Sequence, residues 1–307
     1  AGVDGLEAEE LSVVPGLDEV FALSDIKHHA SSEEWDVIVV DCAPTAETIR
    51  LLSLPEVMSR YMDRPFPIGR RVNRLVWPLV SAMASLPAAD DGVFAATERL
   101  HARLSGVRDI LTDGRRTSVR LVVNPERVVI AEARRTHTYL SLFGYHVDAV
   151  IANRLLPDGV TDPWFAGWRD AQAAHLRTID EAFAPVPVLR APLAPAELVG
   201  PEALAAFAGA VYGDEDPTAR FGTTEPLRVR ATDGDLVLEM ALPFTSTDDL
   251  EVGRVDGELL VRVGPYRRAV SLPDSLRCRE VTGADLAGGR LTVAFGSAGQ
   301  APAAPMA

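Results

Sequence analysis

The chain has 307 residues, 47% of them hydrophobic, and a formal net charge of −14 at pH 7. This length and apolar content suffice for two domains with a sizeable core, and the charge argues against a nucleic-acid partner, because a phosphate backbone binds clustered cations. No apolar run approaches the roughly 18 residues of a membrane span and no signal peptide opens the chain, so we expect a cytoplasmic protein without direct membrane insertion.

The cysteines and the single lysine argue against a disulfide framework and against a phosphate-binding loop within these residues. Cys42 and Cys278 are far apart in the sequence and form neither a CxxC pair nor a disulfide framework. Lys27 is the only lysine, and no glycine lies near it. A phosphate loop of the form G-x-x-x-x-G-K-[ST] needs glycines followed by a lysine, so these residues contain no such loop.

The N-terminal part predicts two helices, broken at Pro15-Gly16, and then a strand. Residues 37–40 are four consecutive β-branched apolar residues that end at Asp41, which is typical of a buried parallel strand. Such a strand would place Asp41 at its carboxyl end, where a carboxylate can bind Mg²⁺ and where Thr45 can cap the next helix or contact a phosphate. In the simpler alternative, Asp41 only caps the following turn.

Residues 41–50, Asp-Cys-Ala-Pro-Thr-Ala-Glu-Thr-Ile-Arg, resemble the second switch of the ArsA/Get3 family of dimeric ATPases, which reads Asp-Thr-Ala-Pro-Thr-Gly-His-Thr-Leu-Arg. Six positions match, and the family's Gly-His pair is Ala46-Glu47 here. The resemblance implies that Asp41 orders Mg²⁺ and its waters as a metal ligand. It also implies that Asp41 and Thr45 are catalytic, and that Thr45 and the backbone after Pro44 move with the γ-phosphate of ATP.

A helical segment is expected next, over about 58–111. Apolar helices of this kind are usually core. In the Get3 branch, however, a helical insert after the second switch forms an apolar groove for hydrophobic clients. Three methionines, Met58, Met62 and Met83, would suit such a groove, because their side chains adapt to different partners.

Strand and helix patterns then alternate, which predicts an α/β fold with a doubly wound, mostly parallel sheet. The resemblance makes this a sheet of the P-loop NTPase type that lacks the phosphate-loop strand, within an ATPase domain spanning 1–224. The expected strands cover 119–123, 147–152 and 186–189, and the expected helices between them cover about 130–143 and 163–183.

Two of these strand ends carry candidate adenine contacts. Asn153 has the amide donor and acceptor needed to meet an adenine edge, although an asparagine can equally satisfy turn backbone. Its context, V-x-x-Asn-x-Leu-Leu-Pro, resembles that of the family's adenine-binding asparagine. Pro192 and Leu193 resemble the family's Pro-Leu segment that packs against the base. Likewise, Glu126 begins a charged stretch that resembles one near the family's dimer interface, although such charges are more often a solvated face.

From residue 225 the pattern becomes period two, with short alternating segments separated by Asp-Gly and Gly-Gly turns. This predicts a β-sandwich over 225–296, which resembles the α-crystallin (small heat-shock) domain found on some bacterial ArsA-like ATPases. Such a domain could bind clients, or it could serve only for packing or dimerisation. The tail, 297–307, is expected to be disordered.

The resemblance implies an ATP-binding and hydrolysing ATPase, a MgATP-driven homodimer switch that acts on a hydrophobic client or a membrane-protein partner. The family's phosphate loop and first switch precede the segments recognised here, so either the chain is an N-terminally shortened piece or hydrolysis has been lost. As given, it should be inactive alone. Two other classes stay open: a nucleotide-independent holdase that uses the sandwich and the helical insert, and a different doubly wound enzyme, for which we find no nucleophile-base pair.

Overall fold

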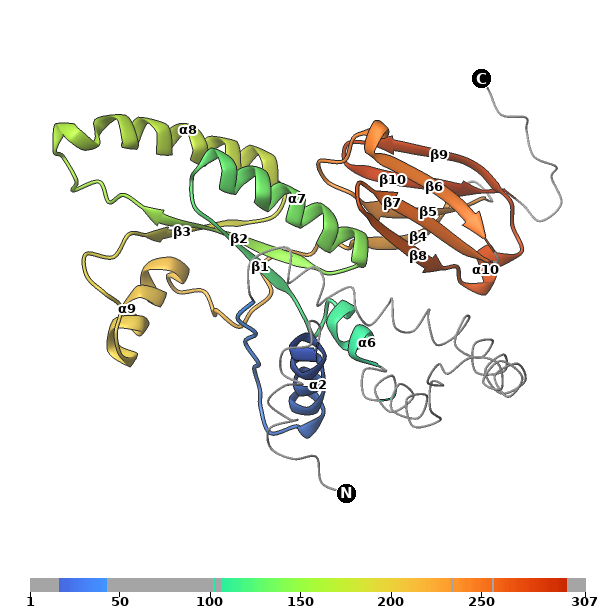
Figure 1. The fold of residues 1–307 in the computed structure, drawn as a ribbon, viewed down its shortest axis with the longest axis horizontal. Helices are drawn as coiled ribbons and strands as arrows, with labels where there is room; N and C mark the ends of the chain where they lie inside the picture. Colours follow the sequence, from blue (N-terminus) through green and yellow to red (C-terminus); the bar gives the residue numbers. More distant parts are fainter. Residues whose placement is uncertain (1–16, 43–101, 103–105, 233–234, 256, 297–307) are drawn as a thin grey trace, which may run out of the picture. The chain divides into compact units, whose positions relative to one another are not determined.

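The computed structural model describes residues 17–42, 102, 106–232, 235–255 and 257–296 (Figure 1). The chain divides into two compact units, Ala1–Asp113 and Gly114–Ala307. The first contains helices α2 (Leu17–Ser32) and α6 (Val107–Thr112), which pack against each other. Helix α6 begins after Gly106, whose φ of 80° lies in the left-handed region that favours glycine.

The segment 37–40 differs from its prediction, because it forms no strand and its side chains are exposed, with Val39 at 87%. A β-branched run becomes a strand only where a neighbouring strand accepts its backbone hydrogen bonds. No strand among the described residues pairs with this run. The expected buried strand is therefore not observed, and Asp41 lies in an exposed segment.

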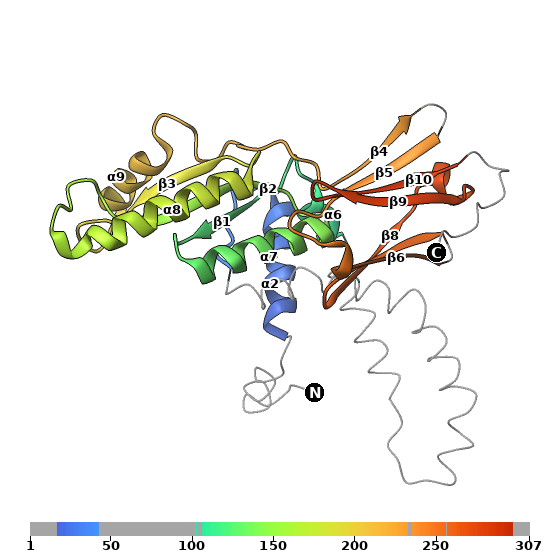
Figure 2. The same ribbon diagram turned by 90° about the horizontal axis from the view of Figure 1, so that it is seen from above.

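Sheet A, in the second unit, has three parallel strands in the order β1-β2-β3. Helices α7 and α8 cover one side of it and α9 lies on the other (Figures 1 and 2), which confirms the parallel α/β architecture. The first four residues of β2 are buried, as a central strand between helices requires. These elements are β1 (Val119–Val123), α7 (Arg127–Phe143), β2 (Val147–Leu155), η1 (Pro163–Phe165), α8 (Ala166–Phe183), β3 (Val188–Pro192) and α9 (Pro201–Tyr212).

The linker between α9 and β4, residues 213–226, contacts sheet A, and Arg120 makes several of these contacts. Arg120, the second residue of β1, donates hydrogen bonds to the carbonyl oxygens of Pro217 (2.6 Å) and Ala219 (2.8 Å). Its guanidinium carbon lies 4.8 Å from the centre of the Phe221 ring. The linker is therefore a fixed segment rather than a free tether.

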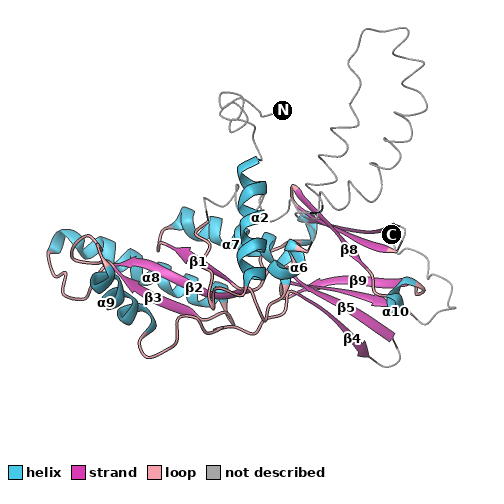
Figure 3. Cartoon of the chain, turned by 90° about the horizontal axis from the view of Figure 1, so that it is seen from below, coloured by secondary structure: helices cyan, strands magenta, loops and turns pink. Residues whose placement is uncertain are grey.

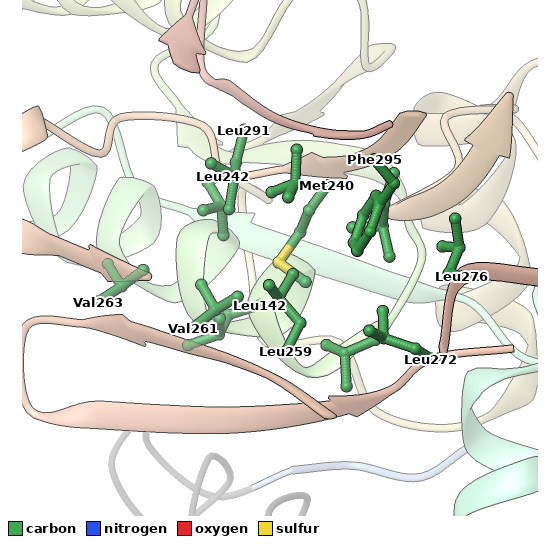
Figure 4. Close-up of a cluster of buried hydrophobic side chains, with 13 residues drawn as sticks. Leu142, Met240, Leu242, Leu259, Val261, Val263, Leu272, Leu276, Leu291 and Phe295 are labelled. Carbon is green, nitrogen blue, oxygen red and sulfur yellow. The ribbon is translucent and has the colours of Figure 1, made fainter. Parts of the chain in front are cut away.

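The C-terminal region forms the predicted antiparallel sandwich of two sheets (Figure 3). One sheet has the strand order β4-β5-β10-β9 and the other the order β6-β7-β8. Buried Leu, Val, Met and Phe side chains of both sheets meet in one cluster (Figure 4). The elements are β4 (Leu227–Thr232), β5 (Asp235–Ala241), η2 (Thr247–Asp249), β6 (Leu250–Val255), β7 (Glu258–Val263), β8 (Tyr266–Ser271), α10 (Asp274–Arg277), β9 (Val281–Ala287) and β10 (Arg290–Phe295).

Candidate functional site

The carboxyl ends of β1, β2 and β3 lie at one edge of sheet A, because the three strands are parallel and adjacent. Leu155 pairs with Pro192, and the backbone N–H of Leu193 donates to the carbonyl oxygen of Leu155 at 2.7 Å. Asn153 is two residues before Leu155 on the same strand. The fold thus brings Asn153, Pro192 and Leu193 to the edge where open α/β sheets bind their ligands.

Asn153 lies at an irregularity of β2. The pairing of β2 with β3 shifts register between Ala152 and Leu155, and Arg154 has a left-handed φ of 56°. The Asn153 Oδ1 atom accepts a hydrogen bond from the Arg154 N–H at 2.9 Å. Such bulges re-aim side chains and are common next to binding sites. The turn role and the ligand role are compatible, because the oxygen has a second lone pair and the amide group two donors.

A groove with a volume of about 430 Å³ opens at the same edge, between the ends of β1 and β2 and the start of α8. Its apolar wall is aromatic: Trp164 is 71% exposed and Trp168 is 59% exposed. Arg127 and Arg154 also line it. Glu126 lines the groove as well, so this edge combines exposed indoles with charges of both signs, two of them cationic.

Local hydrogen bonds build the groove wall. The Asp162 carboxylate accepts from the backbone N–H of Trp164 at 2.8 Å and so caps η1. The side-chain oxygen of Gln172 accepts from the backbone N–H of Leu156, also at 2.8 Å, and ties α8 to the end of β2. The sequence analysis missed this groove, although two tryptophans and a phenylalanine within five residues were a usable signal.

The remaining predicted site residues are not joined to this edge by the structure. Asp41 is exposed and belongs to the other unit. Pro44 and Thr45 lie outside the described residues, as do most of the expected helical insert and the tail 297–307. A single carboxylate is a chemically suitable ligand for Mg²⁺, which usually retains several waters. No group of three or more His, Cys, Asp or Glu able to hold a metal occurs in the described part of the chain.

A parallel sheet with helices on both sides, followed by an antiparallel sandwich, defines an α/β protein with an added β domain. The model of the anion-transporting ATPase family matches residues 1–213, and that of the HSP20-like domain found in ArsA matches residues 233–295. The chain therefore belongs to the anion-transporting ATPase family, which includes the ArsA and Get3 ATPases.

Relatives support this assignment over most of the chain. An arsenical pump-driving ATPase of Aquifex aeolicus is 35% identical over 280 residues, which are 90% of this chain and 71% of that protein. Another, of Prosthecochloris vibrioformis, is 34% identical over 281 residues, which are 90% of this chain and 69% of that protein. The ATPase get3 of Schizosaccharomyces pombe is 27% identical over 209 residues, covering 67% of this chain and 62% of that protein. None of the described helices is long and apolar enough to cross a bilayer.

Proposed function

We propose that this chain is the base-binding and switch portion of a MgATP-hydrolysing ATPase of the ArsA/Get3 type. The observation that carries the proposal is the placement of Asn153, Pro192 and Leu193 at one carboxyl edge of sheet A. Asn153 would bind the adenine edge through its amide, and Pro192 with Leu193, which is 44% exposed, would offer apolar contact to the base.

Asp41, Pro44 and Thr45 complete the proposed site. The Asp41 carboxylate would hold Mg²⁺ through its waters, and Thr45 with the backbone after Pro44 would respond to the terminal phosphate. Magnesium would supply neutralisation of phosphate charge. These 307 residues contain no G-x-x-x-x-G-K-[ST] loop, so we expect the chain alone to bind MgATP weakly and not to hydrolyse it.

The aromatic edge favours a homodimer in this proposal. Trp164, Trp168 and Val128, which is 79% exposed, present large apolar side chains beside the charged residues Arg127 and Arg154. Exposed apolar area rimmed by charge is typical of a protein interface. A second copy would cover it, and the nucleotide-dependent closure of that dimer would act on a hydrophobic client or a membrane-protein partner in the cytoplasm.

The base contact is tested by measuring the binding of a fluorescent ATP analogue with Mg²⁺ by anisotropy. The measurement uses this chain and, beside it, the product of the complete reading frame that encodes it. Replacing Asn153→Ala should weaken binding up to about tenfold, because one or two hydrogen bonds to the base are lost. The matched control is Asn124→Ala, at the end of the neighbouring strand. An equal loss in both variants, or none in Asn153→Ala, would contradict the assignment.

A nucleotide-independent holdase is the second candidate, and the HSP20-like match over residues 233–295 favours it. It would bind clients through the sandwich and the helical insert. Suppression of the aggregation of a denatured model client, equal with and without MgATP, would support the holdase. Suppression that depends on MgATP would support the ATPase.

A further inference from the structure

The C-terminal half of α7 is built into the HSP20-like sandwich. Leu142, the second-last residue of α7, is fully buried and belongs to the hydrophobic cluster of the two sandwich sheets (Figure 4). The ring of Tyr139, one turn earlier, lies 4.3 Å from that of Tyr266 in β8. The Thr138 hydroxyl also donates to the carbonyl oxygen of Pro243, which follows β5. One helix therefore serves as core for both sheet A and the sandwich.

A buried arginine of the sandwich completes the end of this helix. Arg268, in β8, is 4% exposed and donates a hydrogen bond to the carbonyl oxygen of Leu142 at 2.6 Å. The last carbonyls of a helix have no partner within the helix and carry partial negative charge, so a cation there is stabilising. Gly144, the C-cap residue, admits this approach: a Cβ atom on it would lie 3.1 Å from the Arg268 guanidinium nitrogens.

The junction between α7, α8 and the loop after β5 is also buried. His137 of α7 is 9% exposed, and its ring stacks on Phe183 at the end of α8, with centroids 5.9 Å apart. Phe244, in the loop after β5, approaches the same histidine edge-on at 6.1 Å. Both α7 and α8 therefore meet the loop after β5 in an aromatic contact, in which the His137 and Phe183 side chains are buried.

We propose that α7, sheet A and the sandwich form one cooperative folding unit, so that the HSP20-like domain is a fixed arm of the ATPase core and not a tethered module. The inference rests on three contacts of α7 with the sandwich and its loop, namely Leu142 in the sandwich core, Arg268 at the C-terminus of α7 and His137 at the buried junction. The same helix packs on β1 and β2 of sheet A. None of these contacts involves the proposed nucleotide site, so this inference and the proposed function can be tested separately.

Hydrogen exchange followed by mass spectrometry tests this on the 307-residue chain, using peptides that cover β1 and β2 and peptides that cover β5 and β10. The variant is Leu276→Ala, in α10, which lies at the end of the sandwich remote from α7 (Figures 1 and 3). A buried Leu→Ala cavity should speed exchange by about 30-fold or more. In one cooperative unit both sets of peptides accelerate equally. Acceleration of β5 and β10 alone would overturn the proposal.

A second pair of variants tests the contact itself. Arg268→Met removes the cation at the end of α7 while keeping an apolar stem of similar length. Its matched control is Arg262→Met, on the neighbouring strand, where the arginine is exposed and pairs with Glu251. We expect Arg268→Met to separate the exchange of the sandwich from that of sheet A by about tenfold or more, and Arg262→Met to leave them together. Equal behaviour of the two variants would contradict the role of Arg268.

Discussion

The two ends of α7 lie in opposite environments. Its first turn begins at the groove, beside exposed indoles and charged side chains, whereas its last turn is enclosed by the sandwich. Apolar side chains are exposed to solvent at the first end, whereas those at the enclosed end are buried and contribute to the free energy of unfolding. If the exposed end binds a ligand or a partner, as proposed, substitutions at the two ends of α7 should affect different properties: binding at the first turn and stability at the last turn.

The largest expected effect is at the enclosed end. Leu142→Ala should lower the free energy of unfolding by about 3 kcal/mol, because it leaves a cavity in the sandwich core, to which α7 contributes this side chain. Chemical unfolding followed by circular dichroism measures this loss. The same helix offers the control Val128→Ala, which is 79% exposed and should cost less than about 0.5 kcal/mol. Similar losses of stability in both variants would contradict the different roles of the two ends of α7.

The next effect is a pH dependence from His137. Burial lowers the pKa of His137 to about 4 from an ordinary value of 6.5. The unfolded chain therefore binds this proton between pH 6.5 and 4 while the folded chain does not. The free energy of unfolding is therefore highest above pH 6.5, where His137 is neutral in both states. It falls by up to about 3 kcal/mol as the pH is lowered toward 4, because protonation then favours the unfolded chain.

Urea unfolding at pH 7, 5.5 and 4.5 measures this dependence. His137→Phe, which keeps a ring between Phe183 and Phe244, should flatten it. The same change at His175, beside the groove, should leave the slope in place. If His137→Phe kept the full dependence of the unfolding free energy on pH, that dependence would not come from the buried His137.

A smaller effect is expected at Gly144, whose φ is 89°. Gly144→Ala should cost about 1–2 kcal/mol, because an L residue is strained in the left-handed region and the new methyl group would crowd Arg268. Gly283→Ala is the control, since a Cβ atom there meets nothing within 4 Å. Thermal unfolding should distinguish the two. Equal midpoints would show that the cap of α7 tolerates rearrangement.

The smallest effect on stability is expected at the open end. Trp168→Ala should change the free energy of unfolding by less than about 0.5 kcal/mol, because the side chain is 59% exposed. It should instead weaken self-association, which sedimentation velocity over a concentration series measures. Phe21→Ala, at an exposed aromatic side chain of α2, serves as the comparison. A large loss of stability with unchanged association would reverse the assigned roles of the two ends.

Sequence patterns located most of the sheet strands because local composition and burial agree there. They failed at 37–40, where the same β-branched composition occurs without a described pairing partner. They also missed β9, an edge strand whose sequence Val-Thr-Gly-Ala-Asp-Leu-Ala is weakly apolar and mostly exposed, so that pairing with β10 alone defines it. Strand formation depends on neighbours that a local window does not contain.

The sequence indicated residues at the carboxyl edge of sheet A, but not the arginines that connect distant parts of the second unit. Asn153 and Pro192 come to one edge because Asn153 lies near the end of β2, Pro192 ends β3, and the two strands are parallel. A strand end and the family resemblance indicated Asn153, the resemblance alone indicated Pro192, and their contact with adenine stays a prediction. Arg268 and Arg120 could not be found, since an arginine among alternating residues gives no sign that its partner is a helix terminus or a linker carbonyl. Contacts between backbone carbonyls and distant side chains leave no periodic trace in a sequence.

The contacts of the linker between α9 and β4 determine how the chain should respond to insertions there. Gly222 passes so close to β2 that a Cβ atom on it would lie 2.9 Å from the Asp148 carbonyl oxygen, and Asp148 forms an ion pair with Arg120 at 3.5 Å. Because the linker is anchored at these points, the distance between sheet A and the sandwich depends on the contacts and not on the number of residues in the linker. Extra residues inserted between Tyr212 and Pro217 would form an outward loop and leave the position of the sandwich relative to sheet A unchanged.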